Sequence, residues 1–424
     1  MHYNLRCVEC GETFEDSEQG FLLSCSENHG PAMLQANYEV AGFEPDDDLE
    51  GVFRYHDWLP IRRIYGRSPR TVIFQNEELC EKYNLPNLYF AFNGYWPERD
   101  GGMSTCSFKE LEAACVMARI PEQETRSIVV ASAGNTGRAF LEFGSQYHVN
   151  TTVVIPEFAI PQMWTTVPKA DCVKLVVLKD ADYFDAIQLA DRICDFTDRF
   201  FPEGGAKNVA RRDGMGTVIL AATEAIHAIP DHYFQSVGSG TGAIAVWEMA
   251  WRLVTDATYG QKLPRLHLSQ TQAFPIMAAA WEAHSRALPD IPVEKAREMA
   301  RAAYSPVLGN RKPPYSLTGG LFDALSETGG IFAVPSNEDA ANAGKLFMSL
   351  EGIDLDKAAQ VCLAAFLMEA EANAFYSDDI ILVNLTGGGS ERAHADGIAI
   401  PATADIFFTK EDMAQETIKA RFGF

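Results

Sequence analysis

The stretch from residue 128 to residue 137 is IVVASAGNTG, an apolar run followed by a glycine-containing loop. The apolar run predicts a buried strand, and a helix is expected to begin near Thr136. The same order recurs at 232–253, where the loop is GSGTG at 238–242. Repetition of strand, loop and helix predicts parallel sheets that are covered by helices on both faces.

Other segments fit the same alternation. Strands are expected over 72–74, 88–92, 151–155, 172–178, 265–270 and 380–385, and helices over 108–118 and 183–197. The fold class is therefore α/β, with two parallel-sheet domains and a small N-terminal unit. The expected division is a Cys-containing knuckle at 1–45, a large domain at 46–114 and 216–424, and a smaller inserted α/β domain at 115–215.

The composition excludes several classes of partner. The 424 residues include 35 basic and 58 acidic ones, which gives a formal charge of −23. Such a surface repels nucleic acid and anionic membranes, so neither is an expected partner, and an anionic substrate would need a local basic pocket. We find no apolar run long enough to span a membrane and no secretory signal. The nine cysteines are odd in number and scattered, which predicts free thiols and a cytoplasmic protein.

The 238–242 loop is the first candidate ligand site. Ligands of open parallel sheets collect where strands end and helices begin, because free amides and the helix dipole attract anions there. The residues expected to hold a phosphate monoester are Gly238, Ser239, Gly240, Thr241 and Gly242. A dinucleotide is the alternative, but Asp256 stands in a turn after a helix, where the ribose-binding acid of such sites is not found. A lone phosphate is favoured.

The 132–137 loop offers a second set of amides and hydroxyls. Ser132, Gly134 and Thr136 are expected to bind an amino-acid carboxylate, and Asn135 to donate to a phenolate-type oxygen. Thr386 follows the 380–385 strand and would place its hydroxyl near the nitrogen of an aromatic ring. Alone, each loop could equally be a simple turn that caps a helix.

Lys109 ends the run STCSFK at 104–109, where a helix is expected to begin. Most lysines at such positions are solvated surface charges. Here Phe108 and Leu111 would desolvate the amine and lower its pKa, as a lysine that binds an aldehyde covalently requires. Together with the glycine loops, this lysine predicts a site for pyridoxal 5′-phosphate.

The N-terminal segment contains a second candidate site. Cys7 and Cys10 form a CxxC pair, and Cys25 and His29 follow. The four side chains could close a tetrahedral zinc site. The alternative, which we expect from the sequence, is a small β-rich knuckle that folds without metal.

On these motifs the chain resembles the threonine synthase branch of the fold-type II, tryptophan synthase β-like enzymes that use pyridoxal phosphate. The matching motifs are SFK at 107–109, SAGNTG at 132–137, GSGTG at 238–242 and LTG at 385–387, with the Cys7 and Cys10 opening similar to the family's knuckle. The resemblance covers most of the chain and implies that Lys109 carries the cofactor. It also implies a homo-oligomer.

The chain departs from that branch next to the lysine. Glu110 and Leu111 replace the usual Asp-Arg, and ERDGGM at 98–103 replaces a Pro-Thr-Gly-Ser lead-in. The pattern is most similar to archaeal members that make L-cysteate from O-phospho-L-serine and sulfite for coenzyme M synthesis. The resemblance thus implies a β-replacement in which Lys109 moves the Cα proton.

Basic residues are needed to bind these anions. The candidates are Arg211 and Arg212, with Lys207 and Arg138 behind them. The alternative for the arginine pair is a surface salt bridge to Asp213 or Glu203.

Two other functions stay open. The chain could be a threonine synthase that acts on O-phospho-L-homoserine with water, or a non-enzymatic protein of the same fold that senses an amino acid or phosphate.

Overall fold

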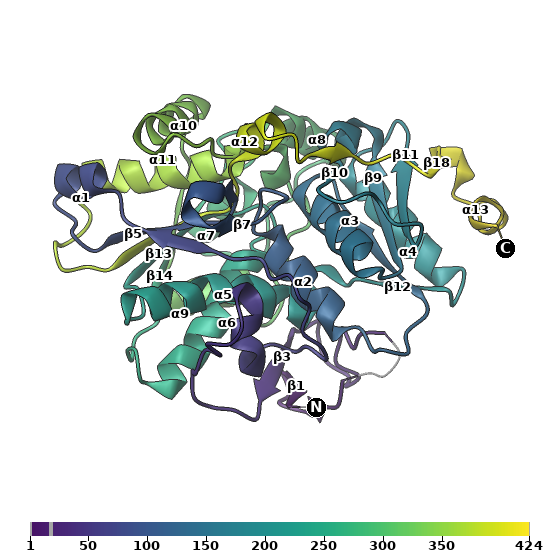
Figure 1. Cartoon of the computed structure of the whole chain (residues 1–424), viewed down its shortest axis with the longest axis horizontal. Helices are drawn as coiled ribbons and strands as arrows, with labels where there is room; N and C mark the ends of the chain where they lie inside the picture. The colour runs from purple at the N-terminus through teal and green to yellow at the C-terminus, as the bar shows by residue number, and fades with distance from the viewer. Residues whose placement is uncertain (1, 17–19, 424) are drawn as a thin grey trace.

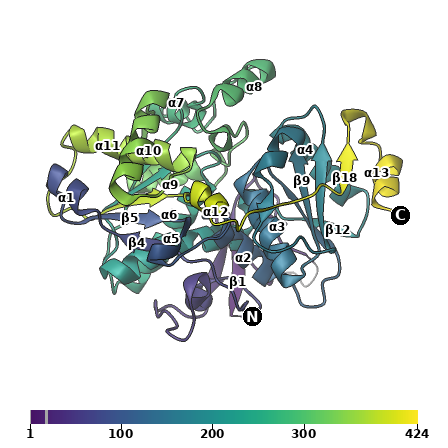
Figure 2. The ribbon, with the colours of Figure 1, turned by 45° about the horizontal axis from the view of Figure 1, so that its top comes forward.

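The computed structural model describes residues 2–16 and 20–423, so residues 1 and 17–19 of the expected N-terminal unit, and residue 424, lie outside the described part. Two lobes lie side by side, each built on its own sheet (Figures 1 and 2). The larger lobe contains a six-stranded sheet in the order β15-β14-β13-β16-β5-β4. Its strands are β4 (Val72–Phe74), β5 (Leu88–Phe92), β13 (His232–Ser236), β14 (Arg265–Ser269), β15 (Ile331–Ala333) and β16 (Ile381–Leu385).

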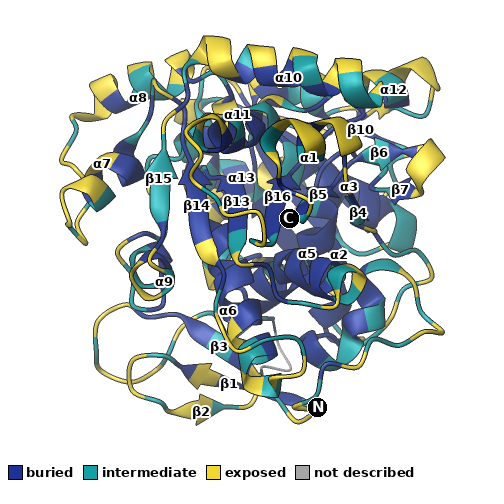
Figure 3. Cartoon of the chain, turned by 90° about the vertical axis from the view of Figure 1, so that its left-hand side faces the viewer, coloured by how far each residue is buried: buried dark blue, intermediate teal, exposed yellow. Residues whose placement is uncertain are grey.

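All neighbouring strands of this sheet are parallel except β4, which pairs antiparallel with β5. The adjacent strands β13, β16 and β5 are buried along nearly their whole length, as expected of parallel strands covered on both faces. In Figure 3 these strands are dark blue, whereas α10 turns an exposed face outward.

The smaller lobe contains a five-stranded parallel sheet in the order β12-β8-β9-β11-β18. Its strands are β8 (Ser127–Ala131), β9 (Thr151–Pro156), β11 (Val173–Leu178), β12 (Phe200–Pro202) and β18 (Ile406–Phe408). Every residue of β9 is buried, which places this strand in the core of the lobe.

The C-terminal segment departs from the predicted domain division. The sequence placed 216–424 entirely in the large domain, but β18 pairs with β11 of the smaller sheet. Figure 2 shows the segment crossing from α12 in the large lobe to β18 in the small one. Ile406 is partly buried and Phe408 is fully buried in the apolar core of the smaller lobe. We therefore propose that residues after about 400 belong to the smaller domain.

Thirteen α-helices surround the two sheets in the described part. They are α1 (Glu77–Tyr83), α2 (Lys109–Arg119), α3 (Asn135–Tyr147), α4 (Tyr183–Asp195), α5 (Val209–Ile226), α6 (Thr241–Asp256), α7 (Ile276–Glu282), α8 (Val293–Ala302), α9 (Leu321–Thr328), α10 (Asn337–Glu351), α11 (Lys357–Glu371), α12 (Ser390–Ala395) and α13 (Gln415–Phe422). None of them is both long enough and apolar enough to cross a bilayer. The largest apolar cluster includes residues of α2, α3, α5 and α6, so the core is continuous between the lobes.

The N-terminal unit is a three-stranded antiparallel sheet in the order β2-β1-β3. Its strands are β1 (Tyr3–Cys7), β2 (Thr13–Phe14) and β3 (Leu34–Tyr38). The remaining strands form two short antiparallel pairs: β6 (Tyr95–Trp96) with β7 (Gly101–Gly102), and β10 (Trp164–Thr165) with β17 (Ile400–Pro401).

Candidate active site

Lys109 is the first residue of α2, and the loop before it is joined to the loop after β16. The Phe108 amide donates to the Thr386 carbonyl at 3.0 Å, and the Gly388 amide donates to the Cys106 carbonyl at 3.2 Å. These bonds bring Lys109 and Thr386, which are far apart in the sequence, to the same edge of the large sheet.

The carboxylate of Glu110 also holds the loop that precedes Lys109. Glu110 is fully buried, accepts from the Thr105 amide and forms an ion pair with Arg67 at 3.3 Å. The Glu110 departure noted in the sequence therefore has a structural role in this chain.

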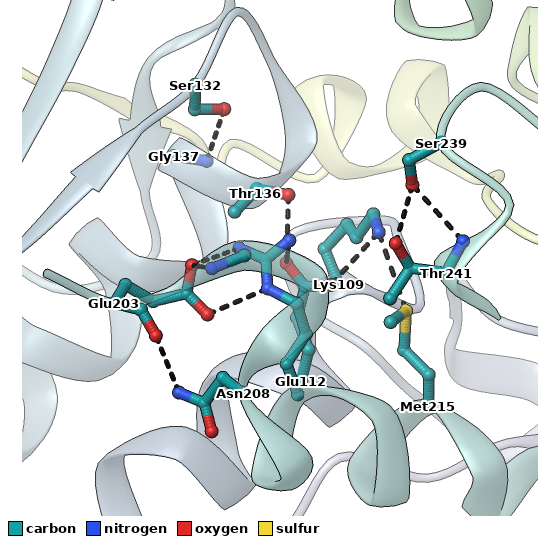
Figure 4. Close-up of polar contacts among 12 residues, drawn as sticks. Lys109, Glu112, Ser132, Thr136, Gly137, Glu203, Asn208, Met215, Ser239 and Thr241 are labelled. Carbon is teal, nitrogen blue, oxygen red and sulfur yellow. Dashed lines mark hydrogen bonds and ion pairs between the residues drawn. The ribbon is translucent and has the colours of Figure 1, made fainter. Parts of the chain in front are cut away.

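The amine of Lys109 faces the space between the two glycine loops (Figure 4). It donates to Glu112 at 3.0 Å and contacts the Met215 sulfur at 3.5 Å. Burial lowers the pKa of Lys109, although the neighbouring Glu112 carboxylate acts in the opposite direction. The sequence predicted this direction from apolar neighbours.

Glu112 links the lysine to a cluster of charges. Its carboxylate accepts from the Thr136 hydroxyl at 2.9 Å and lies 3.3 Å from the Arg211 guanidinium. Arg211 in turn binds Glu203 through two hydrogen bonds of 2.7 Å each. Burial raises the pKa of Glu112, but Arg211 and Lys109 outweigh it, so the pKa lies below its usual value. Two cations and two carboxylates thus balance one another in a buried cluster.

The structure separates the basic candidates proposed from the sequence. Arg211 lies in the site and forms the salt bridge to Glu203 that the sequence offered as an alternative. Its side chain is only 12% exposed, so this salt bridge is not on the surface. Arg212 is fully buried and turns away to Glu248 at 2.8 Å, and Lys207 donates to Ser24 at 3.2 Å. Of the basic candidates in this segment, Arg211 is therefore the one that contacts the charge cluster around Lys109.

Sequence reasoning missed Glu112. Its spacing from Lys109 is i to i+3, which places both side chains on one helix face, and this signal was available. The partner Arg211 comes from α5, and no local pattern predicts that pairing.

The 132–137 loop joins β8 to α3 and is tied by its own side chains. The Ser132 hydroxyl accepts from the amides of Gly134 and Gly137 at 3.2 and 2.8 Å. Asn135 donates to Asp356 at 3.0 Å and accepts from Arg138 at 3.0 Å. A bound carboxylate would therefore have to share amides with Ser132.

The 238–242 loop follows β13, and α6 begins within it at Thr241. Gly240 has a φ of +79°, which favours glycine, and the hydroxyls of Ser239 and Thr241 lie 2.8 Å apart. A methyl group on Gly238 would collide with the Val307 carbonyl, and one on Gly242 with the Gln235 side chain. The loop thus presents bare backbone and two hydroxyls at a helix N-terminus, a set of donors that fits a phosphate monoester.

The carboxyl ends of β5, β13 and β16 are joined by buried hydrogen bonds beneath this loop. Asn384 accepts from Asn93 at 2.7 Å and donates to the Tyr233 hydroxyl at 2.6 Å. Tyr233 donates to Gln235 at 2.7 Å. This buried network of hydrogen bonds holds the ends of the three strands in fixed positions below the site.

Other buried polar atoms at this edge lack partners in the described chain. They are Ser236 Oγ, Ser269 Oγ, Gln270 Nε2 and Thr271 Oγ1, all at or just after the ends of β13 and β14. An unpaired buried polar group costs about 1–3 kcal/mol, so these atoms need partners that the described chain does not supply, such as water or a polar ligand.

Comparisons with known proteins show which family the chain is similar to. The model of a family described as pyridoxal-phosphate dependent enzyme matches residues 83–387. A protein named cysteate synthase from Methanocorpusculum labreanum is 43% identical over 396 residues, which is 93% of this chain and 94% of that protein. Another of that name, from Methanosarcina mazei, is 40% identical over 419 residues, covering 98% and 99%.

Solved structures share the fold. Diaminopropionate ammonia lyase from Escherichia coli superimposes with a TM-score of 0.59 at 14% identity, covering 84% of this chain and 95% of that one. Serine racemase from Dictyostelium discoideum gives 0.54 at 16% identity, covering 76% and 92%. At these identities the likeness is one of fold alone.

Proposed function

The chain belongs to the pyridoxal-phosphate-dependent enzymes, in the cysteate synthase family, and from that premise we propose that it replaces the phosphate of O-phospho-L-serine by sulfite to give L-cysteate. The observation that carries the proposal is the 40–44% identity to proteins named cysteate synthase over at least 93% of this chain. The fold is that of fold-type II enzymes, and the cofactor is pyridoxal 5′-phosphate.

The residues around Lys109 fit that cofactor. We propose that Lys109 binds its aldehyde carbon, that the 238–242 loop holds its phosphate, and that Asn135 and Thr386 face its ring oxygen and ring nitrogen. When bound, the cofactor supplies an electron sink that allows a bond to Cα and then one to Cβ to break.

Lys109 Nζ is the group positioned to move the proton. In its neutral form it accepts the Cα proton, the phosphate leaves Cβ with the electron pair of the C–O bond, and a lone pair on the sulfite sulfur forms the new C–S bond. Lys109 then returns the proton to Cα. The low pKa of the buried amine favours the neutral form, and Glu112 holds the charged form in place.

Two arginines support the handling of anions. Arg211 stands beside Lys109, with its charge shared between two carboxylates. Arg138 forms no ion pair with any described residue; it donates to the Thr105 carbonyl at 3.0 Å and stacks on Trp164. We propose that Arg138 orients Asn135 and supplies positive potential next to the 132–137 loop, and that Arg211 binds the leaving or incoming oxyanion.

Substrate choice tests the proposal directly. Purified enzyme loaded with cofactor is expected to form cysteate and release phosphate from O-phospho-L-serine when sulfite is present. Phosphate release and cysteate formation by chromatography are measured together, with O-phospho-L-homoserine as the competing substrate. Threonine formation from phosphohomoserine, without cysteate from phosphoserine, would instead identify a threonine synthase.

The glycine loop provides a second test. Gly238→Ala is expected to weaken cofactor binding at least about tenfold, because the added methyl group displaces the loop from Val307. Titration of the apoprotein with pyridoxal phosphate, followed by absorbance, gives the Kd. Gly66→Ala is the matched control, since a methyl group there meets nothing within 4 Å. Equal affinities of the two variants would exclude this loop as the phosphate site.

A further inference from the structure

Three thiols and one imidazole meet in the N-terminal unit, away from the site described above. The ligand atoms of Cys7, Cys10, Cys25 and His29 all lie within 4.8 Å of one another. Cys7 ends β1, whereas Cys25 and His29 come from the long loop between β2 and β3. Residues that are distant in the sequence thus meet next to β1, which lies with β3 at the lower edge of the molecule in Figure 1.

Two of the separations equal those around a tetrahedral zinc ion. The sulfurs of Cys10 and Cys25 are 3.8 Å apart, and Cys7 Sγ is 3.4 Å from His29 Nε2. Bond lengths of about 2.3 Å to sulfur and about 2.0 Å to nitrogen give edges of about 3.8 Å and about 3.5 Å in a tetrahedron. A disulfide between Cys10 and Cys25 would require about 2.05 Å.

The groups around these side chains prepare them as ligands. His29 Nδ1 lies 2.7 Å from the Gly30 carbonyl and must donate to it, which leaves the Nε2 lone pair facing the thiols. The Glu27 amide donates to Cys25 Sγ at 3.4 Å, and the amides of Glu9 and Cys10 hydrogen-bond to Cys7 Sγ. Hydrogen bonds of this kind, made around a metal site, fix the positions of the ligand atoms.

We propose that Cys7, Cys10, Cys25 and His29 bind one zinc ion in a closed, four-coordinate structural site. Four protein ligands leave no position for water or substrate, so the ion stabilises the fold and takes no part in the reaction. The sequence alone favoured a knuckle without metal, because only one well-spaced pair was visible. The inference is independent of the proposed function.

The position of the site indicates what the ion would stabilise. The loop that carries Cys25 packs on the segment that carries Glu203: Leu23 fills the space beside Gly204, and Lys207 donates to Ser24 at 3.2 Å. Glu203 is the carboxylate that binds Arg211. Loss of the ion would therefore loosen a support of the active-site charge cluster.

Metal analysis of the full-length enzyme tests the proposal. Protein purified under reducing conditions from zinc-supplemented medium is expected to contain about one zinc per chain. Exchange with cobalt should give the intense visible bands of a tetrahedral thiolate site. The proposal would be overturned if the protein held less than about a tenth of a zinc ion per chain after reconstitution with zinc alone. It would also be overturned by a disulfide between Cys10 and Cys25 in protein purified under reducing conditions.

Variants locate the metal. Cys10→Ser combined with Cys25→Ser should lose the zinc, whereas Cys80→Ser, on α1, should keep it. His29→Cys preserves four ligands and should keep zinc while shifting the cobalt bands, which provides a readout if the double variant does not fold. Zinc retained in full by the double variant, or cobalt bands unchanged in His29→Cys, would contradict the assignment.

Discussion

Lys109→Ala is expected to lower kcat for cysteate formation by at least about 10⁴-fold, because it removes both the covalent attachment of the cofactor and the group that moves the Cα proton. The side chain is 20% exposed and lies between the two glycine loops, and its amine donates to the Glu112 carboxylate. A carboxylate cannot replace the covalent attachment. Cofactor should still bind noncovalently, since the 238–242 loop is unchanged.

Three measurements distinguish this loss from misfolding. Borohydride reduction of the wild-type enzyme, followed by peptide mass spectrometry, should place the cofactor on Lys109 and on no residue of the variant. Added methylamine should restore part of the activity of Lys109→Ala, since it can enter the vacated space. Lys174→Ala is the matched control, with a side chain 44% exposed on the smaller sheet. Wild-type turnover by Lys109→Ala would refute the proposed site.

The parts of this site that the sequence predicted are those written in short, continuous stretches. The 132–137 and 238–242 loops follow apolar strands directly, so the order of residues is enough to infer their location at a sheet edge. Lys109 and Thr386 were also found from local patterns. Their proximity depends on the bonds between Phe108 and Thr386, which only the fold provides.

What could not be predicted depends on contacts between distant elements. Arg211 reaches both Glu112 and Glu203 because α5 packs against α2, and no period in the sequence encodes that contact. The pairing of β18 with β11 has the same origin: a three-residue strand carries too weak a pattern to be assigned to a particular sheet. In the N-terminal unit the Cys7 and Cys10 pair is a local pattern, whereas the loop between β2 and β3 places Cys25 and His29 next to it.

The charge cluster has a consequence for the catalytic amine. With Lys109 charged, Lys109 and Arg211 balance Glu112 and Glu203. Once Lys109 is neutral, the cluster carries an excess negative charge that favours return of a proton to the amine. The two carboxylates therefore oppose the effect of burial on the pKa of Lys109, which still lies below its usual value.

Removing the guanidinium from this cluster should have the largest effect on stability. Arg211→Met leaves Glu112 and Glu203 buried without their main cation, and breaking a buried ion pair in this way costs about 3–5 kcal/mol in the free energy of unfolding. Chemical denaturation at neutral pH measures the loss. Arg265→Met is the control, because Arg265 is exposed and donates to a backbone carbonyl.

The pH dependence separates this cause from a simple loss of packing. In the wild type the folded-state pKa of Glu112 is lowered, so its contribution to stability is present above the unfolded-state pKa of about 4.3 and is lost as pH falls through the folded pKa. In Arg211→Met the carboxylate is buried without that cation and takes up a proton more readily. The deficit of the variant should therefore be largest near pH 7 and shrink toward pH 5, and Glu112→Gln should partly restore the stability of Arg211→Met. A deficit that is the same at both pH values, with no rescue, would show that Arg211 stabilises the fold through packing rather than charge.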